Sequence, residues 1–400
     1  MKDFPIIYLN SNDGTGLLAF GDGSSFELRD QMNPLLLQQF VDDHANKYRF
    51  GYLSYDLKDP LCGVKTTHTD QLDFPLAFFW VPKYVVRLMK EHVEFLQGDK
   101  NVESLEFIEQ FLEEETDQNF HHYNYEFLPR ISKEAYIDTV NTLKGEIQQG
   151  NIYEVNFCQE FYAEQAELNF PLDTYFKLNH ITQAPYSSFF QYGKHTVFCG
   201  SPERFLSKKE KKLISQPIKG TAARGTDEVS DQIIREQLAN DPKERSENIM
   251  IVDLVRNDLS RVAEPNSVHV DELCAIYTYE TVHQMISTIS CDLRKDTRFI
   301  DILHALFPMG SMTGAPKLRA MQLIEEHEVF KRGLYSGSIG YMKPDGDFDF
   351  NVVIRTLLHN AETNYMSCAV GSAITIQSDP EKEYEECLVK VKRILDGINA

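Results

Sequence analysis

Short apolar runs separated by turn residues fill the first hundred positions of the chain. Runs of about four to eight residues rich in Phe, Tyr and Val are typical of β-strands. Seven such runs follow one another: IIYL, GLLAFGDG, FELRD, GYLSYDL, PLAFFWVP, KYVVRLM and HVEFLQGD. One segment between them, NPLLLQQFVDDHA, has helical spacing instead. Residues 1–125 are therefore predicted to form a sheet-rich region that is part of a larger fold and carries no catalytic constellation.

Helical spacing becomes frequent in the rest of the chain. The segment ESLEFIEQFLEEE predicts a short helix, followed by an acidic linker that reaches about Arg130. Ser132 is a favoured N-cap and Gly150 a favoured C-terminal cap, so a helix is predicted between them, with the strand NIYEVNFCQEFYAE after it. Asp-Pro pairs at 241–242 and 379–380 combine an N-cap with a proline at the first helical position. Two further helices are predicted to begin there.

The chain is strongly acidic. Its 400 residues are enough for two or three average domains or for one large one. They include 40 Lys and Arg against 61 Asp and Glu, which gives a formal net charge of −21. This charge disfavours nucleic acid as a partner, and an anionic substrate would need local positive charge or a metal ion.

The cysteines and the apolar content favour a reduced, soluble protein. Seven scattered cysteines, at 62, 158, 199, 274, 291, 368 and 387, never form a CxxC pair, so we expect reduced core residues. The N-terminus has no long apolar run, and nowhere do about 18 apolar residues follow one another. A cytoplasmic protein with no membrane partner is expected.

The segment PIKGTAARG, residues 217–225, constrains one lysine. Pro217 fixes its own φ, Gly220 lets the backbone approach a ligand, and Arg224 adds a permanent positive charge. Lys219 is therefore a candidate nucleophile. At neutral pH it would have to lose its proton, through burial or through a cationic neighbour such as Arg224. The alternative is an ordinary solvated lysine.

Two pairs of glutamates lie near the starts of the helices predicted at 242 and 380. Glu244 and Glu247 are three residues apart, as are Glu383 and Glu386, so each pair shares one helix face. If the two faces converge, the carboxylates would repel one another unless a divalent ion lies between them, and oxygen ligands favour Mg²⁺. Alternatively these acids complement the helix dipoles, with Glu244 closing a capping box on Asp241.

Seven longer motifs occur in one order along the chain: SPERFL, PIKGTAARG, ENIMIVDLVRNDLSRV, MTGAPKLRAM, YSGSIGY, NVVIRT and SDPEKEYEE. In this series the chain resembles the chorismate-utilising enzymes, the family of anthranilate synthase component I, aminodeoxychorismate synthase component I, isochorismate synthase and salicylate synthase. The resemblance implies an α+β fold, a large β-sandwich with outer helices and the active site between its sheets. It also implies a chorismate-binding catalytic region at 130–398 and a variable N-terminal region before it.

The resemblance further implies a role for individual residues. Glu203 would be the general acid for the departing hydroxyl, kept protonated by burial or by nearby carboxylates. The other implied catalytic residues are Lys219, His283 and Thr313. The implied substrate-binding residues are Gly220, Thr221, Tyr335, Arg355, Gly371 and Ser372, and the implied Mg²⁺ ligands are Glu244, Glu247, Glu383 and Glu386.

Plainer interpretations remain open for several of these residues. Arg355, expected to bind the enolpyruvyl carboxylate of chorismate, could form a surface salt bridge. His283 could lie on a helix surface, and Thr313 could cap the helix that Pro316 begins. In the run that follows Val370, alanine replaces the last glycine of the family's GxG pattern, which puts close backbone approach at Ala373 in doubt.

Lys219 also narrows the implied activity within the family. A lysine there is similar to aminodeoxychorismate synthase component I, whereas anthranilate synthases usually carry alanine. The implied reaction converts chorismate and ammonia into 4-amino-4-deoxychorismate, for p-aminobenzoate and folate synthesis, through a covalent Lys219 intermediate. No GxCxGxQ-like glutaminase elbow appears in the chain, so a separate glutamine amidotransferase subunit is expected to supply the ammonia in a heterodimer. Anthranilate synthase component I and a non-catalytic chorismate-binding subunit are the alternatives.

Glu154 departs from the family pattern. Members that add water carry a lysine there, taken as a general base, and aminating members usually carry glutamine. Activities that add water are therefore not favoured. The role of the glutamate stays open, and a solvated strand residue is an equal interpretation.

Overall fold

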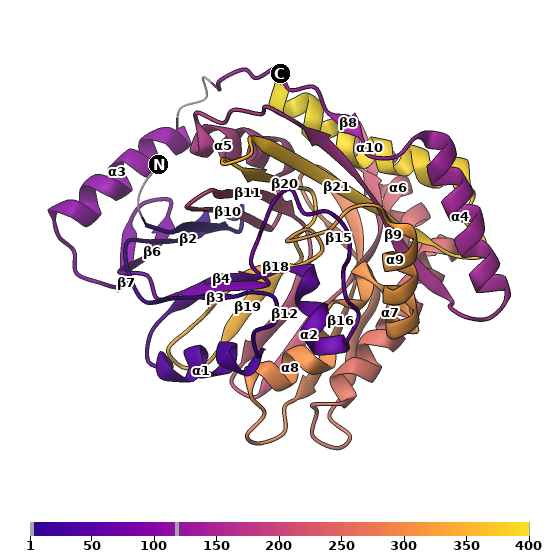
Figure 1. Cartoon of the computed structure of the whole chain (residues 1–400), viewed down its shortest axis with the longest axis horizontal. Coiled ribbons are helices and arrows are strands. Elements are labelled where there is room, and N and C mark those ends of the chain that lie inside the picture. Colours follow the sequence, from indigo (N-terminus) through magenta and orange to yellow (C-terminus); the bar gives the residue numbers. More distant parts are fainter. Residues whose placement is uncertain (1–3, 117–119, 400) are drawn as a thin grey trace.

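Two antiparallel sheets make up the centre of the molecule (Figure 1). The computed structural model describes residues 4–116 and 120–399, so part of the predicted acidic linker, residues 117–119, lies outside the described residues. Sheet A has eleven strands and sheet B has ten. The largest hydrophobic cluster contains residues of both sheets, which confirms the sandwich that the family resemblance implied.

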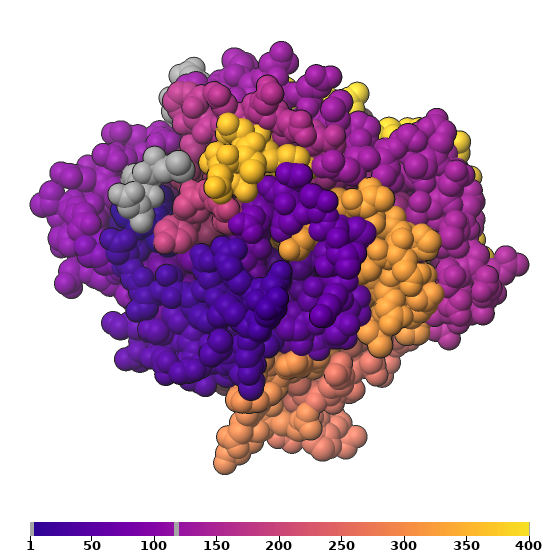
Figure 2. All heavy atoms as spheres, viewed as in Figure 1, coloured from indigo at the N-terminus to yellow at the C-terminus, as the bar shows by residue number. Residues whose placement is uncertain are grey.

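The N-terminal strands belong to both sheets. All seven predicted runs form strands: β1 (Ile6–Asn10), β2 (Thr15–Phe20), β3 (Ser25–Leu28), β4 (Arg49–Leu53), β5 (Ala77–Trp80), β6 (Tyr84–Met89) and β7 (Val93–Gln97). β1, β2, β6 and β7 extend sheet A, and β3, β4 and β5 extend sheet B. In the space-filling view these indigo residues form a continuous surface with later parts of the chain (Figure 2).

The later strands complete both sheets. Sheet A runs through β17 (Gly314–Ala315), β9 (Glu154–Ala163), β21 (Tyr365–Ile374), β20 (Thr356–Asn360), β11 (His195–Ser201) and β10 (Tyr186–Tyr192), with β8 (Leu128–Pro129) paired to β9. Sheet B runs through β14 (Ile218–Ala223), β16 (Val282–Asp292), β13 (Lys212–Gln216), β12 (Arg204–Lys209), β19 (Phe348–Asn351) and β18 (Ser338–Met342), with β15 (His269–Thr278) paired to β16.

Helices cover the outside of the sandwich. A second hydrophobic cluster joins the outer face of sheet A to α3 (Val102–Thr116), α4 (Lys133–Gln148), α5 (Pro171–Thr182), α9 (Lys317–His327) and α10 (Pro380–Asn399). The remaining helices, on the side of sheet B, are α1 (Leu35–Asp43), α2 (Lys58–Cys62), α6 (Glu228–Asn240), α7 (Pro242–Ser260) and α8 (Phe299–Leu306). The predicted helices at 33–45, 103–115, 132–150, 242 and 380 are confirmed.

Local signals explain where the helices begin. The Ser132 hydroxyl accepts a hydrogen bond from the Ala135 amide, as expected of an N-cap. Asp241 caps α7 by accepting from the amides of Lys243 and Glu244, but no capping box with the Glu244 side chain forms. Among the described residues, no helix has both the length and the apolar content needed to cross a membrane.

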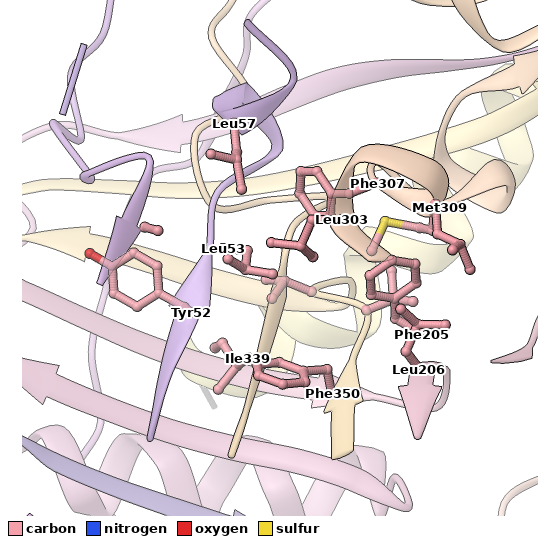
Figure 3. Packing of buried hydrophobic residues seen from close by; sticks show 14 of the residues in the cluster. Tyr52, Leu53, Leu57, Phe205, Leu206, Leu303, Phe307, Met309, Ile339 and Phe350 are labelled. Carbon is pink, nitrogen blue, oxygen red and sulfur yellow. The ribbon is translucent and has the colours of Figure 1, made fainter. Parts of the chain in front are cut away.

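The core also holds the loop that follows α8. Figure 3 shows Leu53 of β4, Ile339 of β18 and Phe350 of β19 on the sheet side, with Leu303 of α8 and Phe307 packed near them. All of these side chains are buried. All seven cysteines are free and six are buried, as predicted for reduced core residues. This packing supports the segment after Phe307, which carries two residues of the candidate site.

Candidate active site

Lys219 connects the two sheets. It lies on β14 of sheet B, and its Nζ donates a 2.8 Å hydrogen bond to Oε1 of Glu154 on β9 of sheet A. The Lys219 side chain is 10% exposed and that of Glu154 is 1% exposed. Glu154 is therefore a buried partner of the candidate nucleophile, and the solvated interpretation of both residues is wrong.

The charge balance around Lys219 keeps its ammonium protonated. Burial lowers the pKa of Lys219, but three neighbouring carboxylates outweigh it and raise that pKa above the ordinary value. They belong to Glu154, Glu247 and Glu203. Arg224, expected to depress this pKa, donates two 2.8 Å hydrogen bonds to Asp231 instead. The sequence-based explanation for a neutral lysine is thus wrong, because the resting amine is held as a cation.

Glu203 lies in the same buried region. It follows β11, is 4% exposed, and its Oε1 accepts a 2.7 Å hydrogen bond from the Ser311 hydroxyl. Burial raises the pKa of Glu203 to about 7, although the Ser311 hydrogen bond and the charges of Lys219 and Arg355 lower it. The predicted protonated carboxyl is therefore consistent with the structure. Burial is the cause, and the four glutamates predicted to bind Mg²⁺ do not contribute to it.

Thr313 and His283 are both buried, in different settings. The Thr313 hydroxyl donates to the carbonyls of Met309 and Gly310, and its own carbonyl accepts from the Asn156 amide of β9. It does not cap α9, whose N-cap is Pro316.

His283 lies on β16, so the helix-surface interpretation is wrong. Its register partner is Ala222 of β14, three residues from Lys219. The ring nitrogens lie 3.0 Å from Asp231 Oδ1 and 2.9 Å from Thr278 Oγ1.

Arg355 lies within electrostatic reach of Glu203 but forms no ion pair among the described residues. Its backbone is left-handed, with φ 52°, and among the described residues no carboxylate lies within salt-bridge distance of its guanidinium. Burial lowers the pKa of Arg355, the charge of Arg393 lowers it further, and that of Glu203 opposes both. The predicted alternative of a surface salt bridge is not found. A free guanidinium fork suits a carboxylate ligand.

The other predicted substrate-binding residues lie in different settings. Gly220 has φ +88°, and a Cβ there would lie 3.1 Å from Glu244 Oε2, so a larger residue would press on that carboxylate. Tyr335 is buried, whereas Thr221 on β14 is exposed. At Gly371 a Cβ would come within 2.7 Å of both the Asn156 amide and the Cys158 sulfur, so β9 requires glycine there.

The four glutamates predicted to bind Mg²⁺ come from α7 and α10. Lys243 belongs to α7 and its side chain reaches α10, with Nζ 3.1 Å from Glu383 Oε1 and 3.8 Å from Glu247 Oε1. Glu383 Oε2 also accepts a hydrogen bond from Ser372. Glu386 is among the groups that raise the pKa of Glu244, after burial, so the two helices begin near each other, which was the condition for a shared metal site.

The donor chemistry of this cluster suits a divalent cation. All four side chains offer carboxylate oxygens, which Mg²⁺ prefers. Oε1 of Glu247 is buried and has no hydrogen-bond partner among the described residues, and burial raises the pKa of this residue to about 7. Within the described ranges, however, no three His, Cys, Asp or Glu side chains gather closely enough to form a ready ligand set. A bound cation would have to draw the two pairs together and displace Lys243 from between them.

Three residues of the site were not predicted. Glu154 had an open role, and Ser311 and Lys243 were not singled out. Ser311 lies two positions before Thr313, and Lys243 directly precedes Glu244, so proximity to a motif was the available signal. For Glu154 no local signal was available, because the same strand also contains Asn156, Gln159 and Glu160.

Comparisons with known proteins identify relatives of the chain. Residues 10–396 match the family described as chorismate binding enzyme. Aminodeoxychorismate synthase component 1 of Klebsiella aerogenes is 39% identical over 270 residues, which cover 68% of this chain and 59% of the relative. The probable chloroplastic aminodeoxychorismate synthase of Oryza sativa subsp. japonica is 42% identical over 270 residues, which are 66% of this chain and 30% of the relative. The aligned part thus spans between about a third and three fifths of these two relatives.

Solved structures show the same fold. Anthranilate synthase component I of Streptococcus pneumoniae superposes with a TM-score of 0.80 at 25% identity, covering 95% of this chain and 92% of that chain. The menaquinone-specific isochorismate synthase of Escherichia coli superposes with a TM-score of 0.77 at 20% identity, covering 98% of this chain and 88% of that chain.

Proposed function

Because the chain belongs to the chorismate binding enzyme family, we propose that it acts as an aminodeoxychorismate synthase component I, which replaces the 4-hydroxyl of chorismate by an amino group. One observation carries this proposal. Lys219 is held inside the site, within the electrostatic reach of Glu203 and opposite Glu154. A buried lysine beside a protonated carboxyl provides a nucleophile and an acid for a displacement reaction.

Chorismate carries two carboxylates, and we propose a partner for each. The free guanidinium of Arg355 would bind the enolpyruvyl carboxylate through two parallel hydrogen bonds. Glu244, Glu247, Glu383 and Glu386 would hold Mg²⁺, which when bound would neutralise the ring carboxylate and polarise the ring. Gly371 keeps the backbone of β21 close to β9 at this end of the site, where its carbonyl accepts from Lys390.

The proposed chemistry uses Lys219 and Glu203 in turn. The Lys219 amine attacks C2 of the ring, both ring double bonds shift, and the C4–O bond breaks. Glu203, with a pKa of about 7, is available in its protonated form near neutrality and gives its proton to the departing hydroxyl, which leaves as water. Ammonia then adds at C4 and the lysine leaves.

We further propose that a separate glutamine amidotransferase supplies the ammonia. The Klebsiella aerogenes relative is named component 1 of its synthase, which implies a second component in that organism. In this chain no GxCxGxQ-like elbow occurs. Added ammonium should therefore support turnover by the chain alone, whereas glutamine should support it after addition of a glutaminase subunit. A cytoplasmic location is part of the same proposal.

Anthranilate synthase component I is the second candidate function. The Streptococcus pneumoniae structure supports it, as does a Synechocystis relative named anthranilate synthase component I-like protein, 32% identical over 357 residues that cover 87% of this chain and 72% of the relative. That reaction adds ammonia at C2, where Lys219 would attack in the proposed mechanism. Lys219 therefore favours amination at C4.

The covalent step provides a direct test of the proposed function. Without ammonium, the chain incubated with chorismate and Mg²⁺ should gain the mass of chorismate less one water, and peptide mapping should place this adduct on Lys219. Lys219→Ala should show no adduct. An adduct on another residue, or turnover at the native rate by Lys219→Ala, would contradict the proposed mechanism.

A further inference from the structure

In the contact between Glu154 and Lys219, one of the two Glu154 carboxylate oxygens makes no hydrogen bond to a described residue. Oε1 of Glu154 accepts the Lys219 hydrogen bond at 2.8 Å. Oε2 is buried and has no hydrogen-bond partner among the described residues. An unpaired buried polar atom costs free energy, so its persistence beside a candidate nucleophile points to a chemical role.

The backbone around Glu154 holds this carboxylate in place. Glu154 pairs in register with Ala315 of β17. The adjoining Gly314 has φ +144°, and a Cβ there would lie 2.2 Å from the Glu154 carbonyl. Because the backbones of β17 and β9 are in close contact here, β9 has little room to move. The backbone position from which the Glu154 side chain extends is therefore fixed.

From this arrangement we infer that Glu154 is a catalytic residue, the base that takes a proton from the Lys219 ammonium before the lysine attacks chorismate. The inference rests on the proposed function and assigns its missing proton acceptor. An ammonium has no lone pair, so Lys219 cannot attack until a group within hydrogen-bond reach accepts a proton.

No other charged group competes for this role by contact. The carboxylates that face Lys219 electrostatically are Glu154 from β9, Glu203 from the turn after β11, Glu244 and Glu247 from α7, and Glu386 from α10. Among the described residues, Glu154 alone of these lies within salt-bridge distance of Lys219 Nζ. The proton of the ammonium therefore has one direct acceptor.

The proton balance closes over one turnover. Glu154 accepts one proton from Lys219, leaving a neutral amine whose lone pair forms the N–C2 bond while the C4–O bond breaks. Glu203 gives its proton to the leaving hydroxyl, and water is released. When ammonia forms the N–C4 bond, the C2–N bond breaks and Lys219 departs as a neutral amine. Glu154 then returns the proton, which restores both residues, and Glu203 regains its proton from solvent.

Three variants test the inference with ammonium as the nitrogen source. Glu154→Gln keeps the shape but removes the base, so kcat should fall by about 10²–10⁴-fold while the KM for chorismate changes little. The kcat of Glu154→Ala should fall by a similar factor. Added formate should restore part of it, because a small carboxylate can enter the space that the side chain leaves. Glu160→Gln is the matched control, since Glu160 is a buried glutamate of the same strand paired with Arg130 at 3.0 Å, away from Lys219. It should keep its kcat.

The opposite result is equally distinct. If Glu154 were a static counter-charge, its removal would lower the pKa of Lys219, and Glu154→Gln would react at least as fast as the unchanged chain at pH 7. That outcome, or an absence of formate rescue in a folded Glu154→Ala, would overturn the inference and leave the proposed function standing. If the unchanged chain forms no aminated product, the proposed function falls and the inference falls with it.

Discussion

Glu203 is the residue whose protonation state limits the proposed reaction near neutrality. Burial raises its pKa from 4.5 to about 7, and the reaction requires its acid form. The rate should therefore fall as the pH rises through about 7, and Glu203→Gln should remove this limb and lower kcat by about 10²–10⁴-fold. The pH dependence of kcat for both proteins measures this effect.

Ser311 provides a control for the cause of that limb. Its hydroxyl donates a hydrogen bond to Glu203 Oε1 and lowers the pKa of the carboxyl. In Ser311→Ala the decrease of kcat with pH should therefore occur at higher pH. An unchanged limb in Ser311→Ala would show that another group titrates there.

The raised pKa of Glu203 should also make the stability of the fold depend on pH. The folded protein holds the Glu203 proton that the unfolded chain releases, so stability should fall between pH 4.5 and about 7. Glu203→Gln avoids this loss and should be more stable at pH 8 by up to about 3 kcal/mol, at 1.36 kcal/mol for each pKa unit. Urea denaturation at pH 5 and pH 8 measures the free energy of unfolding of both proteins. An equal effect of the substitution at both pH values would contradict this prediction.

Single residues of the site were predictable where a motif marked them. Lys219, Glu203 and Arg355 stand in such motifs, and the structure brings both Lys219 and Arg355 within electrostatic reach of Glu203. Glu154 was not recognised as the partner of Lys219, because 65 positions and two different sheets separate them. A local pattern carries no information on such a contact.

At the scale of elements, α7 and α10 form the candidate metal site. The Lys243 side chain links the two helices through its contacts with Glu247 and Glu383. Lys243→Met should lower the melting temperature without divalent ions, because Glu383 loses a cation at 3.1 Å. It should also enlarge the rise in melting temperature that Mg²⁺ produces, since no ammonium competes with the ion. Thermal denaturation with and without Mg²⁺ measures both effects.

Lys133→Met is the matched control for this prediction. Lys133 contacts Glu381 and Glu385 of α10 outside the candidate metal site. Its replacement should leave the Mg²⁺ effect as it is in the unchanged chain. The same Mg²⁺ effect in all three proteins would argue against metal binding at these helices.

The buried ion pair of Arg332 with Glu328 connects the segment at Met312 to β9. Arg332 and Glu328 are about 1% and 2% exposed, and Arg332 donates to the carbonyls of Met312 and Asn156. Arg332→Met leaves Glu328 buried without its partner, so the free energy of unfolding should fall by about 3–5 kcal/mol. Urea denaturation tests this, with Arg256→Met as a control because the pair of Arg256 with Asp253 is exposed. A loss as small as in the control would contradict the assigned role.

At the scale of the whole molecule, short apolar runs predicted the strands but not their order. The seven N-terminal runs were recognisable because each is apolar and is bounded by turn residues. The pairing of β1 with β10 and of β4 with β18 joins residues more than 170 positions apart, as Ile7 with Phe190 and Gly51 with Gly340 show. The sandwich itself was predictable through the order of seven motifs, which reflects a shared ancestral fold.

The most direct test of the proposed function is product analysis. The purified chain would be incubated with chorismate, Mg²⁺ and ammonium, with products identified by mass and pyruvate assayed alongside. We predict 4-amino-4-deoxychorismate without pyruvate, and none of it from Lys219→Ala. Anthranilate with an equal amount of pyruvate would leave the fold and the family unchanged but would contradict the role assigned to Lys219.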